Sequence, residues 1–465
     1  MGNLPHLRIY LRQYKSQKNN EQSTYLKLVS AFLIRRNVHS LFLGGKIAVN
    51  MYRKGRGMSS ISFLHIADLH LDSPFSGLKQ LPEQIFKRIQ ESTFKSFYNL
   101  IDLAINAQVD FVIIAGDLFD GEDHSIRAAS RFRKQMQRLK EHDIHIYLIH
   151  GNHDHMGGNW NILEWPSNVH VFGQNVEVKQ FLKEGKPLVN LYGFSYPQRA
   201  VTENMTHHYI KQDGTKFHIG ILHGSIEGNL DHNHYAPFRL NELTSKGFDY
   251  WALGHIHKQQ LLLDNPIILY PGNTQGRHRK ESGEKGGFIV RMNEFGTDYQ
   301  FYPTADVIWE NVEISISDLN NLTELLDKCF TTIAETRHET AGTFLTIEIT
   351  GTGPLHEKLL EPDTIDDVIV ALIEGEQEQE NFVWITKIKV TSLSFDRKNT
   401  ITQQSPFLAD LISFIDTYQD TDDAVTALFT HSGARKFLEK FSMDEQLELI
   451  KEAEMLLLND LYRKL

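Results

Sequence analysis

Five short motifs of aspartate, histidine, asparagine and glycine constrain this chain more than any other feature of its sequence. Each motif lies at, or just after, the carboxyl end of an apolar segment that is predicted to be a strand. The motifs are Asp68-Leu69-His70, Gly116-Asp117, Gly151-Asn152-His153-Asp154, His223-Gly224 and Gly254-His255-Ile256-His257. In α/β sheets, ligands gather at the carboxyl ends of strands. The sequence therefore predicts that all five motifs meet at one edge of a sheet.

The apolar segments alternate with helical segments in the first part of the chain. Strands are predicted at 61–66, 109–114 and 144–149, and helices at 82–107 and 126–141. Strands that are joined by helices pair in parallel, whereas strands in quick succession favour antiparallel pairing. The later strands follow quickly, and are predicted at 188–193, 216–222, 249–253, 259–263, 267–270 and 286–292. The expected fold class is α/β, with mixed sheets in a sandwich that is flanked by helices.

The sequence pattern changes near residue 308. Alternating strands are predicted at 312–316, 344–349 and around 383–393, with helices at 318–335 and 363–373. A chain of 465 residues favours two or three domains. We predict a main domain at 58–305, a smaller α+β domain at 306–403 and a helical region at 404–465.

The first 57 residues differ from the rest of the chain in charge. They contain eleven Lys and Arg and a single acidic residue, Glu21. One interpretation is that Met58 is the biological start and that residues 1–57 are not native. The alternative is a basic, disordered arm that binds nucleic acid. The remaining residues contain 37 basic and 58 acidic side chains, so binding to a polyanion would depend on local basic patches.

Cysteine content and hydropathy limit where the protein can act. The chain has one cysteine, Cys329, so it forms no internal disulfide, which fits a reducing compartment. No apolar stretch is long enough to cross a bilayer, and the stretch at 28–34 lacks a small-residue cleavage site after it. We expect a cytoplasmic protein that neither spans a membrane nor is secreted.

The residue types in the five motifs are typical of a centre for two divalent metal ions. Carboxylate, amide and imidazole ligands together favour manganese, iron or zinc, and manganese is the expected ion. Two neighbouring ions need a shared ligand, for which Asp117 is the natural candidate. Such ions activate a water molecule for attack on a phosphodiester. His153 could assist by protonating the leaving oxygen, with Asp154 orienting its ring.

The ordered motif set resembles the calcineurin-like metallophosphoesterase superfamily. The resemblance implies that one ion is held by Asp68, His70, Asp117 and His257. It implies that the second ion is held by Asp117, Asn152, His223 and His255, and that His153 is the catalytic histidine. The corresponding fold is a calcineurin-like sandwich.

A narrower resemblance points to the SbcD-like DNA repair exonucleases, and within them to the YhaO group. It is carried by residues 64–72, by residues 115–120 and by the stretch Tyr270-Pro271-Gly272-Asn273-Thr274-Gln275-Gly276-Arg277-His278. In SbcD-like proteins a small second domain caps the nuclease site. One position departs from that branch, because Asp120 stands where SbcD-like nucleases often have a histidine.

The resemblance implies a DNA exonuclease with DNA as substrate, with endonuclease activity as a further option. Two alternatives stay open: a phosphatase or phosphodiesterase for a protein or a small nucleotide, and a non-catalytic DNA-binding subunit. Arg277 is a candidate substrate-binding residue, although its basic cluster could equally be a solvated turn. The resemblance also implies that an SbcC-like or YhaN-like coiled-coil ATPase binds the C-terminal helices. The sequence leaves open whether the chain forms a homodimer.

Overall fold

The computed structural model describes the central part of the chain. The described residues are 60–73, 75, 81–121, 125–157, 164–227, 235–351, 353–391, 410–411, 413–415, 449–450 and 453. The predicted extension 1–57 and nearly all of the predicted helical region 404–465 lie outside them. In the part of the chain that the structure describes, no helix has the length and apolar character needed to cross a membrane.

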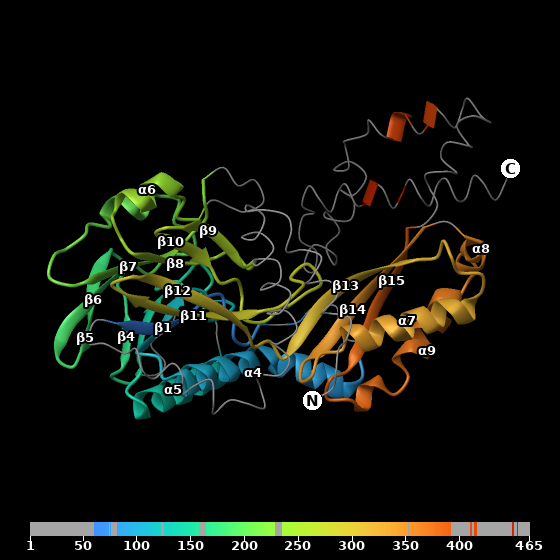
Figure 1. Cartoon of the computed structure of the whole chain (residues 1–465), viewed down its shortest axis with the longest axis horizontal. Coiled ribbons are helices and arrows are strands. Elements are labelled where there is room, and N and C mark those ends of the chain that lie inside the picture. Colours follow the sequence, from blue (N-terminus) through green and yellow to red (C-terminus); the bar gives the residue numbers. More distant parts are fainter. Residues whose placement is uncertain are drawn as a thin grey trace, which may run out of the picture. The chain divides into compact units, whose positions relative to one another are not determined.

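Two six-stranded mixed sheets carry the motifs (Figure 1). The first has the order β12-β11-β1-β2-β3-β4 and the second the order β5-β6-β7-β8-β10-β9. The strands of the first sheet are β1 (Ile61–Ile66), β2 (Phe111–Ala115), β3 (His145–Ile149), β4 (Val169–Val171), β11 (Gly286–Asn293) and β12 (Gly296–Pro303). Those of the second are β5 (Glu177–Lys183), β6 (Lys186–Gly193), β7 (Phe217–His223), β8 (Tyr250–Gly254), β9 (Gln260–Asp264) and β10 (Ile267–Tyr270).

Three layers of buried side chains hold the sheets and their helices together. Alternate residues of β1, such as Phe63 and Leu64, enter cores on opposite faces of the first sheet. Phe63 packs between the two sheets, whereas Leu64 packs against the helices α4 (Glu83–Ala107) and α5 (Ile126–Glu141). A third core covers the outer face of the second sheet and includes Leu243 of the short helix α6 (Leu240–Ser245). The expected sandwich with flanking helices is confirmed.

The pairing of the later strands differs from the prediction. β5–β6, β9–β10 and β11–β12 are antiparallel, as expected for strands in quick succession. The pairs β6–β7, β7–β8 and β8–β10 are parallel, so the antiparallel prediction is wrong for them. The segments 194–216 and 224–249 are long enough to return the chain to the same edge, and β9 reverses direction between β8 and β10. The sequence also failed to predict β4, β5 and β12.

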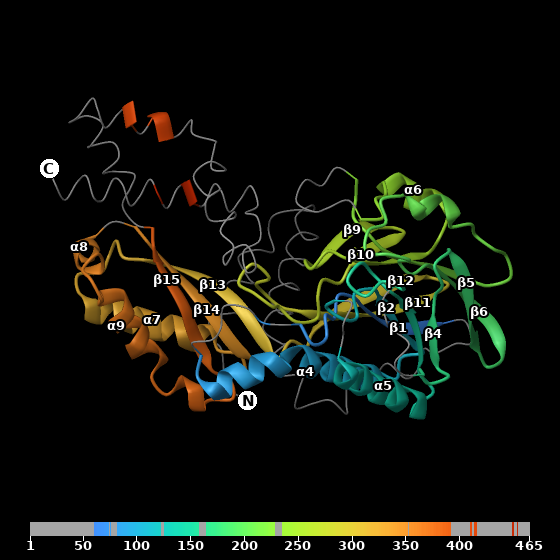
Figure 2. The same cartoon turned by 180° about the vertical axis from the view of Figure 1, so that it is seen from behind.

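A three-stranded parallel sheet, in the order β13-β14-β15, forms the centre of the second domain (Figure 2). Its elements are β13 (Val307–Ser315), α7 (Leu322–Thr336), β14 (Gly342–Thr350), α8 (Leu355–Leu359), α9 (Thr364–Ile373) and β15 (Val383–Val390). A 3₁₀ turn lies at Glu376–Glu378 in this domain, and another lies at Met205–His208 in the main domain. Leu325, Cys329 and Ile333 of α7 share a buried core with the strands. The predicted elements of this region are thus present, although its role as a cap stays a prediction.

The second domain is joined to the main domain by polar contacts around β13. The Arg88 guanidinium on α4 donates to the Asp306 carboxylate and to the backbone oxygen of Thr340. The side-chain amide of Gln275, which is buried, bonds to backbone groups of Asp306 and Val307. The Trp309 indole donates to the backbone oxygen of Gly276 at 3.0 Å. The segment 273–277, which is part of the stretch 270–278 that contributes to the narrower resemblance, therefore anchors the first strand of the second domain.

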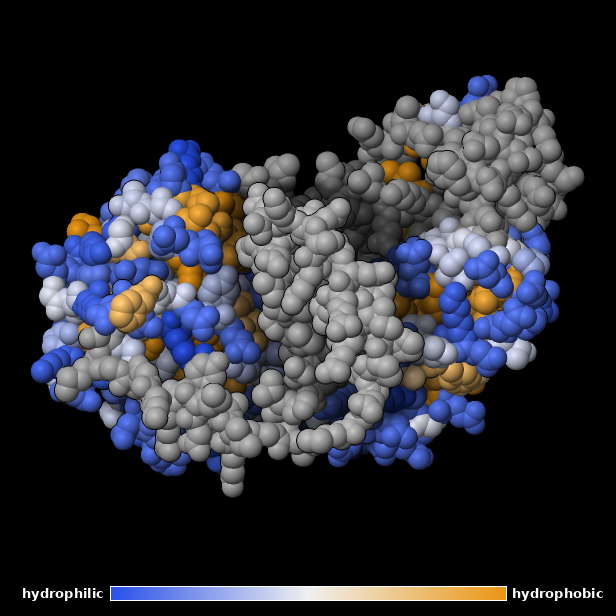
Figure 3. All heavy atoms as spheres, viewed as in Figure 1, coloured by the Kyte–Doolittle hydropathy of each residue, from blue (hydrophilic) through white to orange (hydrophobic). Residues whose placement is uncertain are grey.

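The described surface on the face shown in Figure 3 is mostly hydrophilic, with small separate hydrophobic areas. Exposed single hydrophobic residues such as Phe295 and Ile210 are ordinary on a protein surface.

We expect the substitution Gln275→Ala to loosen the attachment of β13. It leaves the backbone N–H groups of Asp306 and Val307 without their buried acceptor, at a cost of about 1–3 kcal/mol per unsatisfied group. Hydrogen exchange of these two amides should therefore accelerate, which mass spectrometry can measure. The exposed Gln198→Ala is the matched control. Unchanged exchange in the Gln275 variant would contradict the proposed anchor.

Candidate metal centre

Strand ends from both sheets bring the predicted ligands together. Asp68 and His70 follow β1, Asp117 follows β2 and Asn152 follows β3. His223 ends β7 of the second sheet, and the ligands of the Gly254-His255-Ile256-His257 motif follow β8. The prediction that all five motifs meet at one edge of a single sheet is therefore wrong, because the edges of two packed sheets converge.

The backbone at several predicted ligands lies in the left-handed region. The φ angles are 52° at Asp68, 43° at His70, 50° at Asp117 and 98° at His255. Such angles in residues other than glycine cost about 1–3 kcal/mol each and persist only where the surroundings enforce them. Here the backbone N–H groups of Asp68 and His70 donate to the backbone oxygens of Gly116 and Asp117, at 3.1 Å each. The two motif loops therefore hold each other in the conformation that turns the ligands inward.

Two glycines of the motifs are required by close approach. A Cβ atom on Gly116 would lie 2.3 Å from the Nδ1 atom of His223. A Cβ atom on Gly151 would lie 2.3 Å from Oδ1 of Asp117 and 2.7 Å from Nε2 of His223. These two positions are glycine because the side chains of Asp117 and His223 occupy the space in which a Cβ atom would lie.

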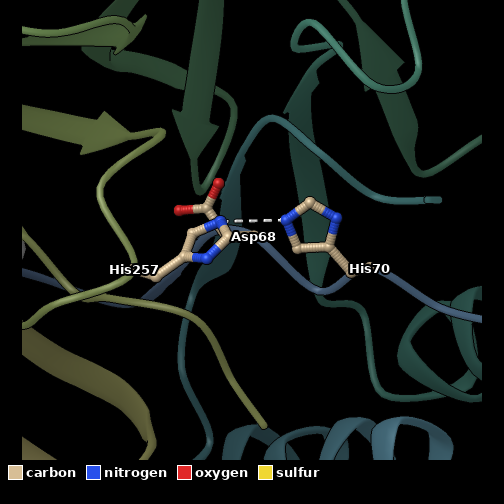
Figure 4. A group of neighbouring side chains, drawn as sticks. All are labelled: Asp68, His70 and His257. Carbon is tan, nitrogen blue, oxygen red and sulfur yellow. Dashed lines mark hydrogen bonds between the residues drawn. The ribbon is translucent and has the colours of Figure 1, made fainter. Parts of the chain in front are cut away.

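Asp68, His70 and His257 form one group of donor atoms (Figure 4). Their ligand atoms lie within 4.8 Å of one another. The Nε2 atoms of His70 and His257 face each other at 3.1 Å. Burial lowers the pKa of His70 to about 4, with a further contribution from the Arg277 guanidinium, so this imidazole is neutral near pH 7. A neutral imidazole is the form that binds a metal ion.

Asp117, Asn152, His223 and His255 form the second group. Oδ1 of Asn152 lies 3.0 Å from Nε2 of His223 and 3.2 Å from Nδ1 of His255. Oδ2 of Asp117 lies 3.4 Å from Nε2 of His223 and 3.8 Å from Nε2 of His70, which belongs to the first group. One carboxylate oxygen is thus placed between the two groups, as a bridging ligand requires.

Hydrogen bonds fix the orientation of the ligand histidines. Nδ1 of His70 bonds to Oδ1 of Asp120 at 3.1 Å, and Nδ1 of His257 bonds to Oε1 of Glu281 at 2.7 Å. Nδ1 of His223 donates to the backbone oxygen of Ala115 at 2.9 Å. A partner on Nδ1 leaves Nε2 as the donor to a metal ion and fixes the ring plane.

His153 is oriented by Asp120 and not by Asp154, so that detail of the prediction is wrong. Nδ1 of His153 lies 3.1 Å from Oδ1 of Asp120. The buried carboxylate of Asp154 instead accepts from the backbone N–H groups of Leu118 and Gly151 and bonds to His150. Burial alone would lower the pKa of His153, but the hydrogen bond to Asp120 and the negative charges of Asp117 and Asp120 together outweigh burial and raise that pKa. Asp120 therefore positions both a predicted ligand and the predicted catalytic histidine.

The charges of the site suit a pair of divalent cations. Burial raises the pKa of Asp68 to about 6. Burial also opposes ionisation of Asp117, yet the nearby His223 holds the pKa of Asp117 well below its ordinary value. Burial opposes the charged form of His223, but the Asp117 and Asp68 carboxylates and the bond to the Ala115 backbone oxygen together outweigh burial and raise the pKa of His223 to about 9. Facing imidazole nitrogens beside two buried carboxylates form a donor set that divalent cations fit, with a cation taking the place of the His223 proton.

Several residues of the site were not singled out from the sequence. Asp120 lies in a recognised motif, but its role was visible only as a departure from the narrower family pattern. Glu281 and Lys285 gave no sequence signal. The Lys285 ammonium is buried and donates to the backbone oxygen of His257 at 2.9 Å. Arg277, which is predicted to bind substrate, contacts the carboxylates of Asp120 and Glu281.

We expect chelator-treated protein to bind two Mn²⁺ ions per chain, and Asp117→Asn to weaken both. The amide removes the shared charge between the two donor groups. The loss of Mn²⁺ affinity should exceed the roughly 10–100-fold loss that follows removal of a residue that only hydrogen-bonds to a ligand. Isothermal titration with Mn²⁺ measures stoichiometry and affinity. The exposed His207→Gln serves as control. Two undisturbed Mn²⁺ sites in the Asp117 variant would refute the bridging assignment.

Comparison with known protein families agrees with this geometry. Residues 61–259 match the calcineurin-like phosphoesterase family. Residues 309–392 match the middle domain of metallophosphoesterase YhaO. The first match spans every predicted metal ligand, and the second spans most of the three-stranded domain.

Individual relatives give the same result. The metallophosphoesterase YhaO of Bacillus subtilis (strain 168) is 41% identical over 404 residues, which cover 86% of this chain and 98% of the relative. The DNA double-strand break repair protein Mre11 of Sulfolobus acidocaldarius is 24% identical over 403 residues, covering 82% of this chain and 99% of the relative. Mre11 of Methanocaldococcus jannaschii is 26% identical over 288 residues, covering 57% and 72%. These matches show that this chain belongs to the calcineurin-like metallophosphoesterases and shares its family with YhaO.

Proposed function

We propose that this metallophosphoesterase hydrolyses phosphodiester bonds of DNA, as an exonuclease. The observation that carries the proposal is the basic wall of the pocket at the metal centre. The pocket has a volume of about 820 Å³ and is lined by the ligands Asp117, Asn152, His255 and His257 and by His153. Its walls also include the cationic side chains of Arg199, Lys258, Lys280 and Lys285.

The position of these cations is informative because the protein is otherwise acidic. Residues 58–465 contain 37 basic and 58 acidic side chains. A basic wall on an acidic body concentrates positive potential where a phosphate chain would approach. Neighbouring phosphates of a nucleic acid could contact Arg199 and Lys258, which are exposed, while the scissile phosphate reaches the ligands. A volume of this size accommodates a nucleotide unit.

His153 is suited to protonate the leaving oxygen. Its Nδ1 atom is held by Asp120, which leaves Nε2 for the substrate. The hydrogen bond to Asp120 and the charges of Asp117 and Asp120 together raise the pKa of His153, which is the direction that a proton donor requires. The proton on Nε2 can then pass to the alkoxide oxygen as the phosphorus–oxygen bond breaks. The two divalent ions would supply an activated water and neutralise the phosphate charge.

The relatives support a nucleic-acid substrate over a protein or small-nucleotide substrate. The archaeal relatives are named as DNA double-strand break repair proteins, and one of them aligns over 99% of its length. A coiled-coil ATPase partner stays a prediction, because the helical region 404–465 lies almost entirely outside the described residues.

We expect Mn²⁺-dependent degradation of DNA that is lost in His153→Ala. The variant keeps every metal ligand but removes the proton donor, so general-acid catalysis of about 100–10,000-fold should disappear while Mn²⁺ binding persists. Labelled single-stranded and duplex DNA are incubated with Mn²⁺ or with chelator, and bis(p-nitrophenyl) phosphate serves as a minimal diester.

The His207→Gln variant provides the control for this assay. Hydrolysis of the minimal diester without any DNA degradation would retain the phosphodiesterase chemistry and reject DNA as the substrate. Loss of Mn²⁺ binding in His153→Ala would show that this histidine supports the ligands instead of donating a proton.

We expect Lys258→Glu and Arg199→Glu to weaken DNA binding without affecting hydrolysis of the minimal diester. Each removes a positive charge that only a longer polyanion can reach, so the KM for DNA should rise. The slope of log affinity against log salt should fall by roughly one per lost phosphate contact, or more because the charge is reversed. Lys95→Glu, on the exposed face of α4, changes net charge equally and should have little effect. Equal losses in all three variants would indicate a net-charge effect and not a binding wall.

A further inference from the structure

We propose that Arg277 is a positioning residue of the metal centre and not a contact for substrate phosphate. Its guanidinium joins two carboxylates, Asp120 and Glu281, and each of these carboxylates holds histidines of the site. The inference rests on the proposed hydrolysis at this centre. Through these two carboxylates, Arg277 fixes the positions of histidines on both sides of the centre.

The first side of this arrangement is Asp120. Its Oδ1 atom receives three contacts: Nδ1 of His70 at 3.1 Å, Nδ1 of His153 at 3.1 Å and a terminal nitrogen of Arg277 at 3.2 Å. The Ser73 hydroxyl donates to the other oxygen of Asp120 at 2.7 Å and accepts from the same guanidinium at 3.2 Å. Arg277 thus fixes the carboxylate that fixes both imidazoles.

The second side is Glu281. Its Oε1 atom bonds to Nδ1 of His257 at 2.7 Å and lies 3.6 Å from the second terminal nitrogen of Arg277. Its Oε2 atom accepts from the backbone N–H of Arg277 at 2.7 Å and from the Asn273 amide at 2.9 Å. Because His70 and His257 belong to the same donor group, the guanidinium links the carboxylates behind two neighbouring ligands.

The surroundings of Arg277 argue against a role in binding substrate. Only 16% of its side chain is exposed, and it is absent from the described residues that line the pocket. Both terminal nitrogens already face carboxylates, so a substrate phosphate would have to displace one of them. Removing the guanidinium would leave the buried carboxylate of Glu281 and the partly buried carboxylate of Asp120 with less positive charge to offset them, which is costly at a largely buried position.

The test compares Arg277→Gln with Arg277→Lys and with the control Arg279→Gln, whose side chain is exposed in the same turn. Titration of the full chain with Mn²⁺ should show an affinity about 10–100-fold lower for Arg277→Gln. The kcat for bis(p-nitrophenyl) phosphate should fall, while KM for DNA at saturating Mn²⁺ stays nearly unchanged. Arg277→Lys should recover part of the affinity, because an ammonium keeps the charge but lacks the planar fork that reaches both carboxylates. Arg279→Gln should behave like the unaltered protein.

Two results would overturn the inference. One is an Arg277→Gln variant with unaltered Mn²⁺ affinity and unaltered turnover of the minimal diester, but a raised KM for DNA, as a phosphate contact predicts. The other is no change in any of these quantities. If Arg277→Gln does not fold, Glu281→Gln replaces it, since the amide still accepts from the backbone N–H of Arg277 but lacks the charge. Unchanged Mn²⁺ affinity in that variant overturns the inference equally.

The Mn²⁺ titration separates this inference from the proposed function. If the unaltered protein binds Mn²⁺ but does not degrade DNA, the exonuclease proposal fails. The ratio of Mn²⁺ affinities between the Arg277 variants and the unaltered protein then still decides whether Arg277 positions the ligands.

Discussion

The carboxylate of Asp117 lies buried between imidazoles from two sheets, and much of the surrounding structure is arranged to hold that charge. Oδ2 lies near His223 of β7 and His70 after β1, while Oδ1 accepts from the backbone N–H of His153. A buried anion is tolerated only when it is paired or hydrogen-bonded. The sandwich supplies these partners because the ends of β1, β2 and β7 converge around one point.

This convergence has a conformational cost that the sheets must offset. The backbones of Asp68, His70 and Asp117 lie in the left-handed region. The surroundings of Gly116 and Gly151 leave no room for a side chain at either position. Loops in such conformations persist when rigid elements hold both of their ends. The buried strands β1, β2 and β3 on one side and β7 and β8 on the other provide that rigidity. Fold and site are therefore coupled through the short segments that follow each strand.

The segment 273–281 serves both the metal centre and the second domain. Glu281 holds His257 from one side, while Gln275 and Gly276 anchor β13 and Trp309 on the other. A substitution in this segment would therefore affect both the metal centre and the attachment of the second domain. Asp120 likewise has two roles. This residue, which departs from the narrower family pattern, orients both His70 and His153.

The sequence by itself determined the strands that carry the motifs and the helices α4 and α5, because these depend on local apolar periodicity. Residue types at strand ends and the family resemblance together predicted the metal ligands, and the structure brings these residues together. It did not determine that β6, β7, β8 and β10 run parallel, since strand direction depends on the path of the long connections. Nor did it pair His153 with Asp120 or His257 with Glu281. These partners lie 33 and 24 residues apart, and only the packing of the two sheets and their loops decides which carboxylate reaches which imidazole.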